Sequence, residues 1–192
     1  MSRIYKTQKA NRTERLIRLF HYSWSIPLIA ELHQTSGAKF VRLVHRLQIS
    51  RDALSRTLDA HMRDGWLARN PGYGHPMRPE YILTSLGKGL GSICQKFLEM
   101  LHHLKIEEAV ALRKWSMPIV FVMCGQPSRF SELKERLPEV TPRALTQALK
   151  DLQSAGLVDR LVQETYPPTA RYRLTSRGQK LCSLLKKFAD VL

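Results

Sequence analysis

The sequence predicts a mainly helical α+β fold with small β-hairpins, built from two tandem copies of one small domain. Two observations lead to this prediction. Sequence motifs recur at an offset of about 91 residues, and each copy passes from helical periodicity to two short strands around a proline-containing turn. The 192 residues are 43% hydrophobic, which is enough apolar material for packed cores.

Ordered motifs define the repeat. Trp-Ser-Ile-Pro at 24–27 returns as Trp-Ser-Met-Pro at 115–118, and Tyr-Ile-Leu-Thr-Ser-Leu-Gly at 81–87 returns as Tyr-Arg-Leu-Thr-Ser-Arg-Gly at 172–178. Between them, apolar positions and one glycine match with a single one-residue gap. We therefore expect a first domain at residues 1–104 and a second at residues 105–192.

The first two helices of each copy are indicated by capping residues and by apolar spacing. Ser25 and Ser116 are candidate N-caps, and a proline follows each of them within the first turn, where the missing N–H costs nothing. Apolar residues spaced by three or four positions then predict a second helix over 40–47 and over 130–137.

A third helix follows in each copy. Ser50 and Thr141 are the expected N-caps, and Pro142 suits the first helical position of the second copy. An apolar stripe of three residues recurs in both copies, and Gly65 and Gly156 are expected to end the helices.

A β-hairpin and a last helix complete each copy. Extended stretches at 66–69 and 157–162 are followed by turns at 71–79 and 167–168, and then by second strands at 81–83 and 172–174. Thr84 or Ser85, and Thr175 or Ser176, are expected to cap helices that run to about Leu104 and Leu192. This order of elements predicts two tandem winged helix-turn-helix domains, in which the third helix is the recognition helix and the hairpin is the wing.

The charge of the chain points to an anionic partner. The chain carries 31 Lys and Arg against 16 Asp and Glu, a formal net charge of +15, and both halves share the excess. Nucleic acid is the first candidate for such a partner. The longest apolar run, at 117–124, is too short to span a membrane, so no membrane is expected.

The exposed side of the third helix supplies candidate base contacts. Arg suits guanine, Gln suits adenine, and Ser or Thr suits either. The candidates are Arg51, Ser55 and Arg56 in the first copy and Arg143, Thr146, Gln147 and Lys150 in the second. Asp52 and Asp59 share this face, and for them we expect a partner within the helix rather than a base.

The wings supply candidate phosphate contacts, because they place cationic side chains on short strands beside a turn. These residues are Arg69, His75 and Arg78 in the first wing and Arg160, Arg171 and Arg173 in the second. Arg171 and Arg173 share a face opposite Tyr172 and Leu174, so this face either meets DNA or is simply solvated.

The second copy resembles the HxlR-type winged helix-turn-helix regulators. The resemblance rests on Lys-Trp-Ser at 114–116, Arg-Phe-Ser-Glu-Leu-Lys at 129–134, Thr-Pro-Arg-Ala-Leu-Thr-Gln at 141–147, Ala-Gly-Leu-Val at 155–158 and Tyr-Pro-Pro at 166–168. The first copy is a more diverged version of this pattern. The resemblance implies a bacterial or archaeal transcription regulator that binds DNA as a dimer, in some members with a sensing cysteine before the first helix. Neither copy has a cysteine there.

Other chemistries have little support in the sequence. The three cysteines are far apart and odd in number, which argues against a disulfide framework and for a reducing compartment. Cys124 is expected to be an inert buried residue within an apolar run. Histidine and cysteine spacings typical of metal sites are absent, and no catalytic constellation emerges, so we expect no metal, no cofactor and no enzyme.

These features predict a cytoplasmic, nucleoid-associated transcriptional regulator that binds double-stranded DNA in a sequence-specific way. Its two copies would form a pseudo-dimer within one chain, with a homodimer through the terminal helices left open. Two alternatives also stay open, namely a plasmid- or phage-type replication initiator with tandem winged helices and a winged-helix protein-interaction module.

Overall fold

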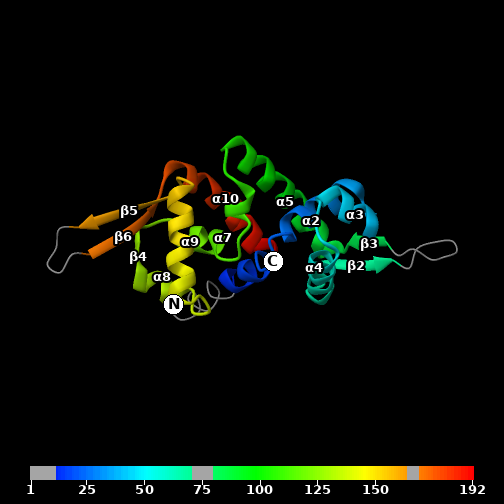
Figure 1. The fold of residues 1–192 in the computed structure, drawn as a ribbon, viewed down its shortest axis with the longest axis horizontal. Helices are drawn as coiled ribbons and strands as arrows, with labels where there is room; N and C mark the ends of the chain where they lie inside the picture. Colours follow the sequence, from blue (N-terminus) through cyan, green and yellow to red (C-terminus); the bar gives the residue numbers. More distant parts are fainter. Residues whose placement is uncertain (1–11, 71–79, 164–168) are drawn as a thin grey trace.

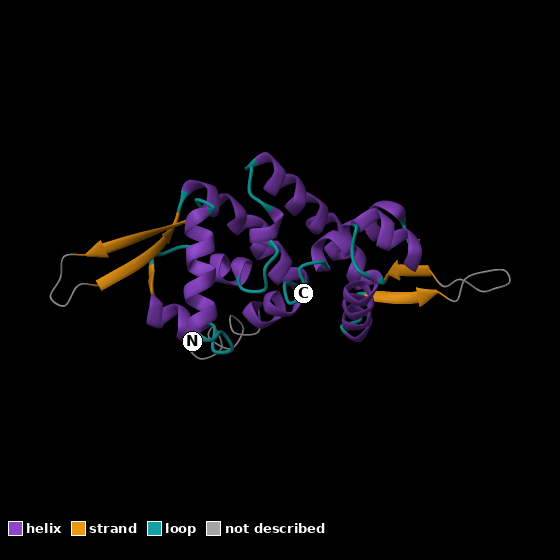
Figure 2. Ribbon diagram, viewed as in Figure 1, coloured by secondary structure: helices purple, strands orange, loops and turns teal. Residues whose placement is uncertain are grey.

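Two similar units form the two ends of an elongated molecule (Figure 1). The computed structural model describes residues 12–70, 80–163 and 169–192. Helix 12–19 and α2 to α5 make up the first unit, and α6 to α10 make up the second. The hairpins of the two units point away from each other (Figure 2). The domain boundary expected at residue 104 stays a prediction.

The expected helices and hairpin strands follow one another in the expected order in each unit, with short additional elements between them. The first contains α2 (Ser25–Thr35), β1 (Ala38–Lys39), α3 (Phe40–Leu47), α4 (Arg51–Arg63), β2 (Leu67–Asn70), β3 (Glu80–Leu83) and α5 (Ser85–His103). The second contains α6 (Glu108–Ala111), α7 (Ser116–Met123), β4 (Ser128–Arg129), α8 (Phe130–Arg136), α9 (Pro142–Ser154), β5 (Val158–Gln163), β6 (Thr169–Leu174) and α10 (Ser176–Val191). The helix-rich fold with small antiparallel sheets is confirmed.

Capping explains where the third helices begin and end. The Ser50 hydroxyl accepts from the backbone N–H of Ala53, and the Thr141 hydroxyl accepts from that of Ala144, so both predicted N-caps are correct. Gly65 and Gly156 follow the helix ends with φ of 75° and 67°, a conformation that glycine adopts without a steric penalty.

The predicted N-caps of α2 and α7 are wrong. Ser25 and Ser116 are the first helical residues, and Trp24 and Trp115 occupy the cap positions without a side-chain hydrogen bond. Both serine hydroxyls are buried, and neither has a hydrogen-bond partner among the described residues.

Two further strands were not predicted. β1 and β4 are two residues long and pair antiparallel with β3 and β6, which gives strand orders β1-β3-β2 and β4-β6-β5. Strands this short carry no alternation that a sequence pattern can reveal. Their effect is to fasten the start of α3 and α8 to the base of each wing.

The wing and the last helix meet at a contact that only glycine allows. A Cβ atom on Gly87 would lie 2.0 Å from the carbonyl oxygen of Trp66, and one on Gly178 would lie 2.3 Å from that of Leu157. Thr84 caps α5 beside this contact, and its hydroxyl also donates to the Gly65 carbonyl at 2.7 Å. Thr175 repeats both bonds in the second copy. The last helix therefore holds the wing at a fixed angle in each unit.

Aromatic rings join the two units at the centre. Phe20 precedes α2, Phe97 lies on α5 and Phe188 lies on α10, and all three are almost fully buried. Their ring centroids are 5.8 to 6.1 Å apart in edge-to-face arrangements. The apolar surface of the two terminal helices is thus buried between α5 and α10 of the same chain.

The structure corrects the interpretation of the cysteines. Cys124, at the end of α7, forms a disulfide with Cys182 of α10, and Cys94 stays free and buried. The sequence separation of 58 residues hides this pairing, because only the packing of α7 against α10 brings the two thiols together. At the equivalent place in the first copy, Gly91 lies directly against the ring of His33.

Within the described residues, no helix combines the length and apolar character needed to cross a membrane.

We expect reduction of the Cys124–Cys182 bond to lower the free energy of unfolding by about 4 kcal/mol, because the bond closes a loop of 58 residues in the unfolded chain. Chemical denaturation of the full chain with and without a thiol reductant measures this change. A Cys124→Ser/Cys182→Ser variant is the control, since its denaturation midpoint should be the same with and without the reductant. Equal midpoints for oxidised and reduced wild type would contradict the expectation.

Candidate nucleic-acid interface

The recognition helix of the first copy, α4, buries one side and exposes the other. Leu54 and Leu58 face the core, while Arg51, Ser55 and Arg56 are exposed as expected. Arg56 donates from Nε to the backbone carbonyl of Asp52 at 3.3 Å, a contact within its own helix. Its two terminal amino groups therefore remain available to a ligand.

The aspartates of α4 differ from the expectation. Arg56 and Arg63 bond to the backbone carbonyls of Asp52 and Asp59, not to their carboxylates. Within the described part of the chain, neither carboxylate takes part in a salt bridge. Both side chains are exposed, so two acidic residues lie on the face that carries Arg56.

The recognition helix of the second copy, α9, has a more cationic exposed face. Arg143, Thr146, Gln147 and Lys150 are all exposed, as predicted. Thr146 donates its hydroxyl hydrogen to the Pro142 carbonyl at 2.8 Å, so its oxygen can act only as an acceptor toward a ligand. At the offset of 91, Arg143 and Lys150 replace Asp52 and Asp59. The two faces therefore differ in charge at two central positions.

The buried side of α4 contains an unusual histidine. His61 is fully buried, its ring centroid lies 4.9 Å from that of Trp66, and neither ring nitrogen has a hydrogen-bond partner in the described structure. Burial lowers the pKa of His61 to about 4. The second copy has Leu152 and Leu157 at the equivalent positions. An aromatic pair, His61 and Trp66, thus stands where the second copy has two leucines.

Each wing has an exposed arginine at the same position of its hairpin. Arg69 pairs across the strands with Tyr81, and Arg160 pairs with Tyr172 in the same register. Both arginines are exposed, so the two hairpins present equivalent cations. His75 and Arg78 lie outside the described residues.

The other two wing arginines are less free than the sequence suggested. Arg173 is exposed but its Nε lies 3.3 Å from a carboxylate oxygen of Asp159. Arg171 is half-buried, and its Nε is buried without a hydrogen-bond partner among the described residues. The shared face of these two residues is therefore partly used within the sheet.

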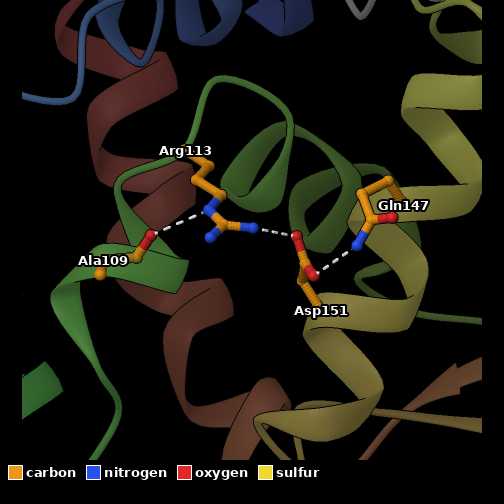
Figure 3. Close-up of polar contacts among 4 residues, drawn as sticks. All are labelled: Ala109, Arg113, Gln147 and Asp151. Atoms are coloured by element: carbon orange, nitrogen blue, oxygen red, sulfur yellow. Dashed lines mark hydrogen bonds and ion pairs between the residues drawn. The ribbon is translucent and has the colours of Figure 1, made fainter.

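A polar network on α9 was missed by the sequence analysis. Arg113, just after α6, forms a salt bridge with Asp151, and Gln147 donates from Nε2 to the other carboxylate oxygen of Asp151 at 2.9 Å (Figure 3). Arg113 also donates from Nε to the Ala109 carbonyl at 3.1 Å. Arg113 and Asp151 are 38 residues apart, so no local pattern connects them. Comparison of the two copies could have marked both, because Tyr22 and Ala60 occupy the equivalent positions.

The described residues contain no group of three or more His, Cys, Asp or Glu side chains arranged to hold a metal ion. The polar atoms of both recognition helices and both wings are instead suited to hydrogen bonds and ion pairs with a polyanion.

Comparison with known families agrees with this architecture. The model of the HxlR-like helix-turn-helix family matches the chain twice, over residues 19–108 and 110–191. The chain belongs to the HxlR-like helix-turn-helix family. The two matches confirm the tandem duplication and the resemblance seen in the second copy. The family contains helix-turn-helix regulators rather than enzymes, in agreement with the expectation from the sequence.

Relatives of this HxlR-like chain match about one copy. A helix-turn-helix transcriptional regulator of Methanothermobacter thermautotrophicus is 36% identical over 77 residues, which cover 40% of this chain and 59% of that protein. YkvN of Bacillus subtilis is 34% identical over 77 residues, covering 40% and 65%. The match thus spans less than two thirds of either relative.

Solved structures also match part of the HxlR-like chain. The redox regulator HypR in its oxidised form shares 30% identity with a TM-score of 0.41, over 43% of this chain and 84% of that one. The reduced form of YodB from Bacillus subtilis shares 27% identity with a TM-score of 0.40, over 43% and 80%.

We expect the stability of the protein to fall as the pH is lowered from 6.5 to 4, by about 3 kcal/mol from His61 alone. In this range the unfolded chain binds a proton at His61 that the folded chain excludes, so acid favours unfolding. Replacing His61 with Leu, the residue of the second copy, should remove this contribution. Denaturation curves at pH 7, 5.5 and 4.5 measure it.

The equivalent position of the second copy supplies the control, since Leu152→Val removes no titratable group and should lower the stability by the same amount at all three pH values. If His61→Leu keeps the full acid destabilisation, the buried histidine is not its source.

Proposed function

We propose that this protein is a transcription regulator that binds double-stranded DNA in a sequence-specific way, using two recognition helices and two wings from one chain. The observation that carries the proposal is the repetition of one exposed arrangement. Each copy presents a polar recognition helix together with a wing arginine in the same register, Arg69 or Arg160. Membership of a helix-turn-helix family and a net charge of +15 support DNA as the partner.

The arrangement of the copies supports an intramolecular pseudo-dimer. α5 and α10 pack together at the centre, α4 and α9 lie on either side of them, and the wings extend in opposite directions (Figure 1). Two-fold symmetric helix-turn-helix dimers read half-sites about one helical turn apart. We propose that the present chain reads two half-sites in the same manner without a second subunit.

The two copies are proposed to differ in their roles. α9 offers Lys150 to the phosphates and Arg143 to a base, whereas α4 carries the acidic residues Asp59 and Asp52 at the same positions. Arg56 suits guanine and Gln147 suits adenine in the major groove. The preferred site is therefore an imperfect palindrome in which the second copy supplies more of the sequence-independent affinity.

Binding is expected to weaken steeply with salt. Each neutralised phosphate releases about 0.9 counterion, so the logarithm of the affinity should fall linearly with the logarithm of salt concentration. Titration of the full chain against selected DNA at several salt concentrations gives the slope. A protein-interaction module would instead show weak DNA binding with little salt dependence, and that result would contradict the proposal.

Substitutions on α9 separate base contacts from phosphate contacts. Arg143→Ala and Gln147→Ala should each relax the sequence preference, at about 1 to 3 kcal/mol per lost base contact. Lys150→Ala should weaken all sequences equally and lower the salt slope by about 1. Selection of bound fragments from a random library, followed by affinity measurements, makes the comparison. Unchanged preferences in both base-contact variants would mean that α9 is not the reading element.

A further inference from the structure

We propose that Asp151, held by Arg113, is a positioning residue that fixes the side-chain amide of Gln147 so that the second copy selects adenine over guanine. This inference rests on the proposed function, because it takes α9 to be the helix that enters the major groove. It adds that two residues that contact no base, Arg113 and Asp151, contribute to the sequence specificity.

The three side chains form a continuous network. Gln147 donates from Nε2 to Oδ1 of Asp151 at 2.9 Å, while Oδ2 of Asp151 receives a hydrogen bond from Arg113 (Figure 3). Arg113 is in turn tied to the Ala109 carbonyl of α6. The Asp151 side chain is 18% exposed, against 55% for Arg113. The Asp151 carboxylate is therefore held in place by Arg113, a residue outside α9, and is largely shielded from solvent.

The chemistry of the carboxylate sets the orientation of the amide. An ionised carboxylate only accepts hydrogen bonds, so Gln147 must turn its NH₂ group toward Asp151. The opposite orientation would bring Oε1 against Oδ1, two acceptors without a hydrogen between them. Asp151 thus leaves Gln147 with a free carbonyl oxygen and one free amide hydrogen.

This remaining pair of groups matches adenine. In the major groove adenine offers the N6 amino group as a donor and N7 as an acceptor, which Oε1 and the second hydrogen on Nε2 of Gln147 satisfy together. Guanine offers two acceptors, O6 and N7, in the same places. Gln147 would need both amide hydrogens for guanine, but one is engaged by Asp151 and Oε1 would face O6.

The first copy lacks every part of this network. At the offset of 91, Arg113, Asp151 and Gln147 correspond to Tyr22, Ala60 and Arg56. The Ala60 side chain has no acceptor group, and among the described residues the Arg56 guanidinium bonds to the Asp52 carbonyl of its own helix. Arg56 does not need a residue that orients it, because its guanidinium carries only N–H donors and guanine presents two acceptors. The network thus occurs in the second copy, where the side-chain amide of Gln147 can take two orientations that differ by an exchange of its oxygen and nitrogen.

A double-mutant cycle tests the inference. The probes are two duplexes that differ by an A·T to G·C exchange at the position whose preference changes most in Gln147→Ala. We expect Asp151→Ala to lower the ratio of adenine to guanine affinity by about five-fold or more. In the Gln147→Ala background the same change should leave the ratio unaltered, because Asp151 acts through Gln147.

Two further variants complete the design. Arg113→Ala should lower the ratio as well, but less than Asp151→Ala, since the bond from Gln147 to Asp151 remains while its anchor is lost. Lys150→Ala, on the same face, should weaken both duplexes and leave the ratio intact. Thermal unfolding of each variant shows that it is folded, and a loss of stability alone changes both affinities without changing their ratio.

The outcomes separate the two proposals. If Gln147→Ala abolishes the preference while Asp151→Ala retains it, Asp151 does not position the amide, and the proposed function stands. If the wild type prefers no sequence and Gln147→Ala changes nothing, the proposed function itself is wrong.

Discussion

The packing of three phenylalanine rings between the two copies is the constraint on which the rest of the molecule depends. Phe20, Phe97 and Phe188 come from the segment before α2, from α5 and from α10, and they bury the apolar sides of both terminal helices. In each copy, the close contact at Gly87 or Gly178 then ties the terminal helix to its own wing. The relative position of the wings is thereby determined from the centre of the molecule outward.

Most of the fold could be predicted because its signals are local. Ser50, Thr141, Gly65 and Gly156 mark helix ends through contacts within a few residues, and these contacts do not depend on the rest of the chain. The repeat then allowed each copy to support the interpretation of the other. Elements that lack local signals, such as β1 and β4, required tertiary structure.

The incorrect predictions have a common physical origin. Ser25 and Ser116 were expected to act as caps, but their positions are decided by burial, which a sequence pattern does not show. The Cys124–Cys182 bond likewise depends on the packing of two helices that are distant along the chain. An odd number of cysteines is no obstacle to a disulfide when the third, Cys94, is buried elsewhere in the core.

The candidate interface was predictable in outline and less so in detail. Apolar spacing indicated which side of α4 and α9 is exposed, and the candidate residues described there are exposed. Spacing gave no information on which polar groups are already engaged, such as Arg173 with Asp159 or Gln147 with Asp151. Those partners decide which hydrogens and lone pairs remain for a ligand, and they become visible only with side-chain positions.

The joining of both units in one polypeptide also changes how the protein responds to dilution. Two separate subunits dissociate as their concentration falls, and their joint occupancy of a site depends on a subunit equilibrium as well as on the site itself. Here one polypeptide carries both units, so the association of the two units with each other does not depend on protein concentration. Each half is also free to change its residues independently, which identical subunits cannot do, as the exchange of His33 and Gly91 for a cystine illustrates.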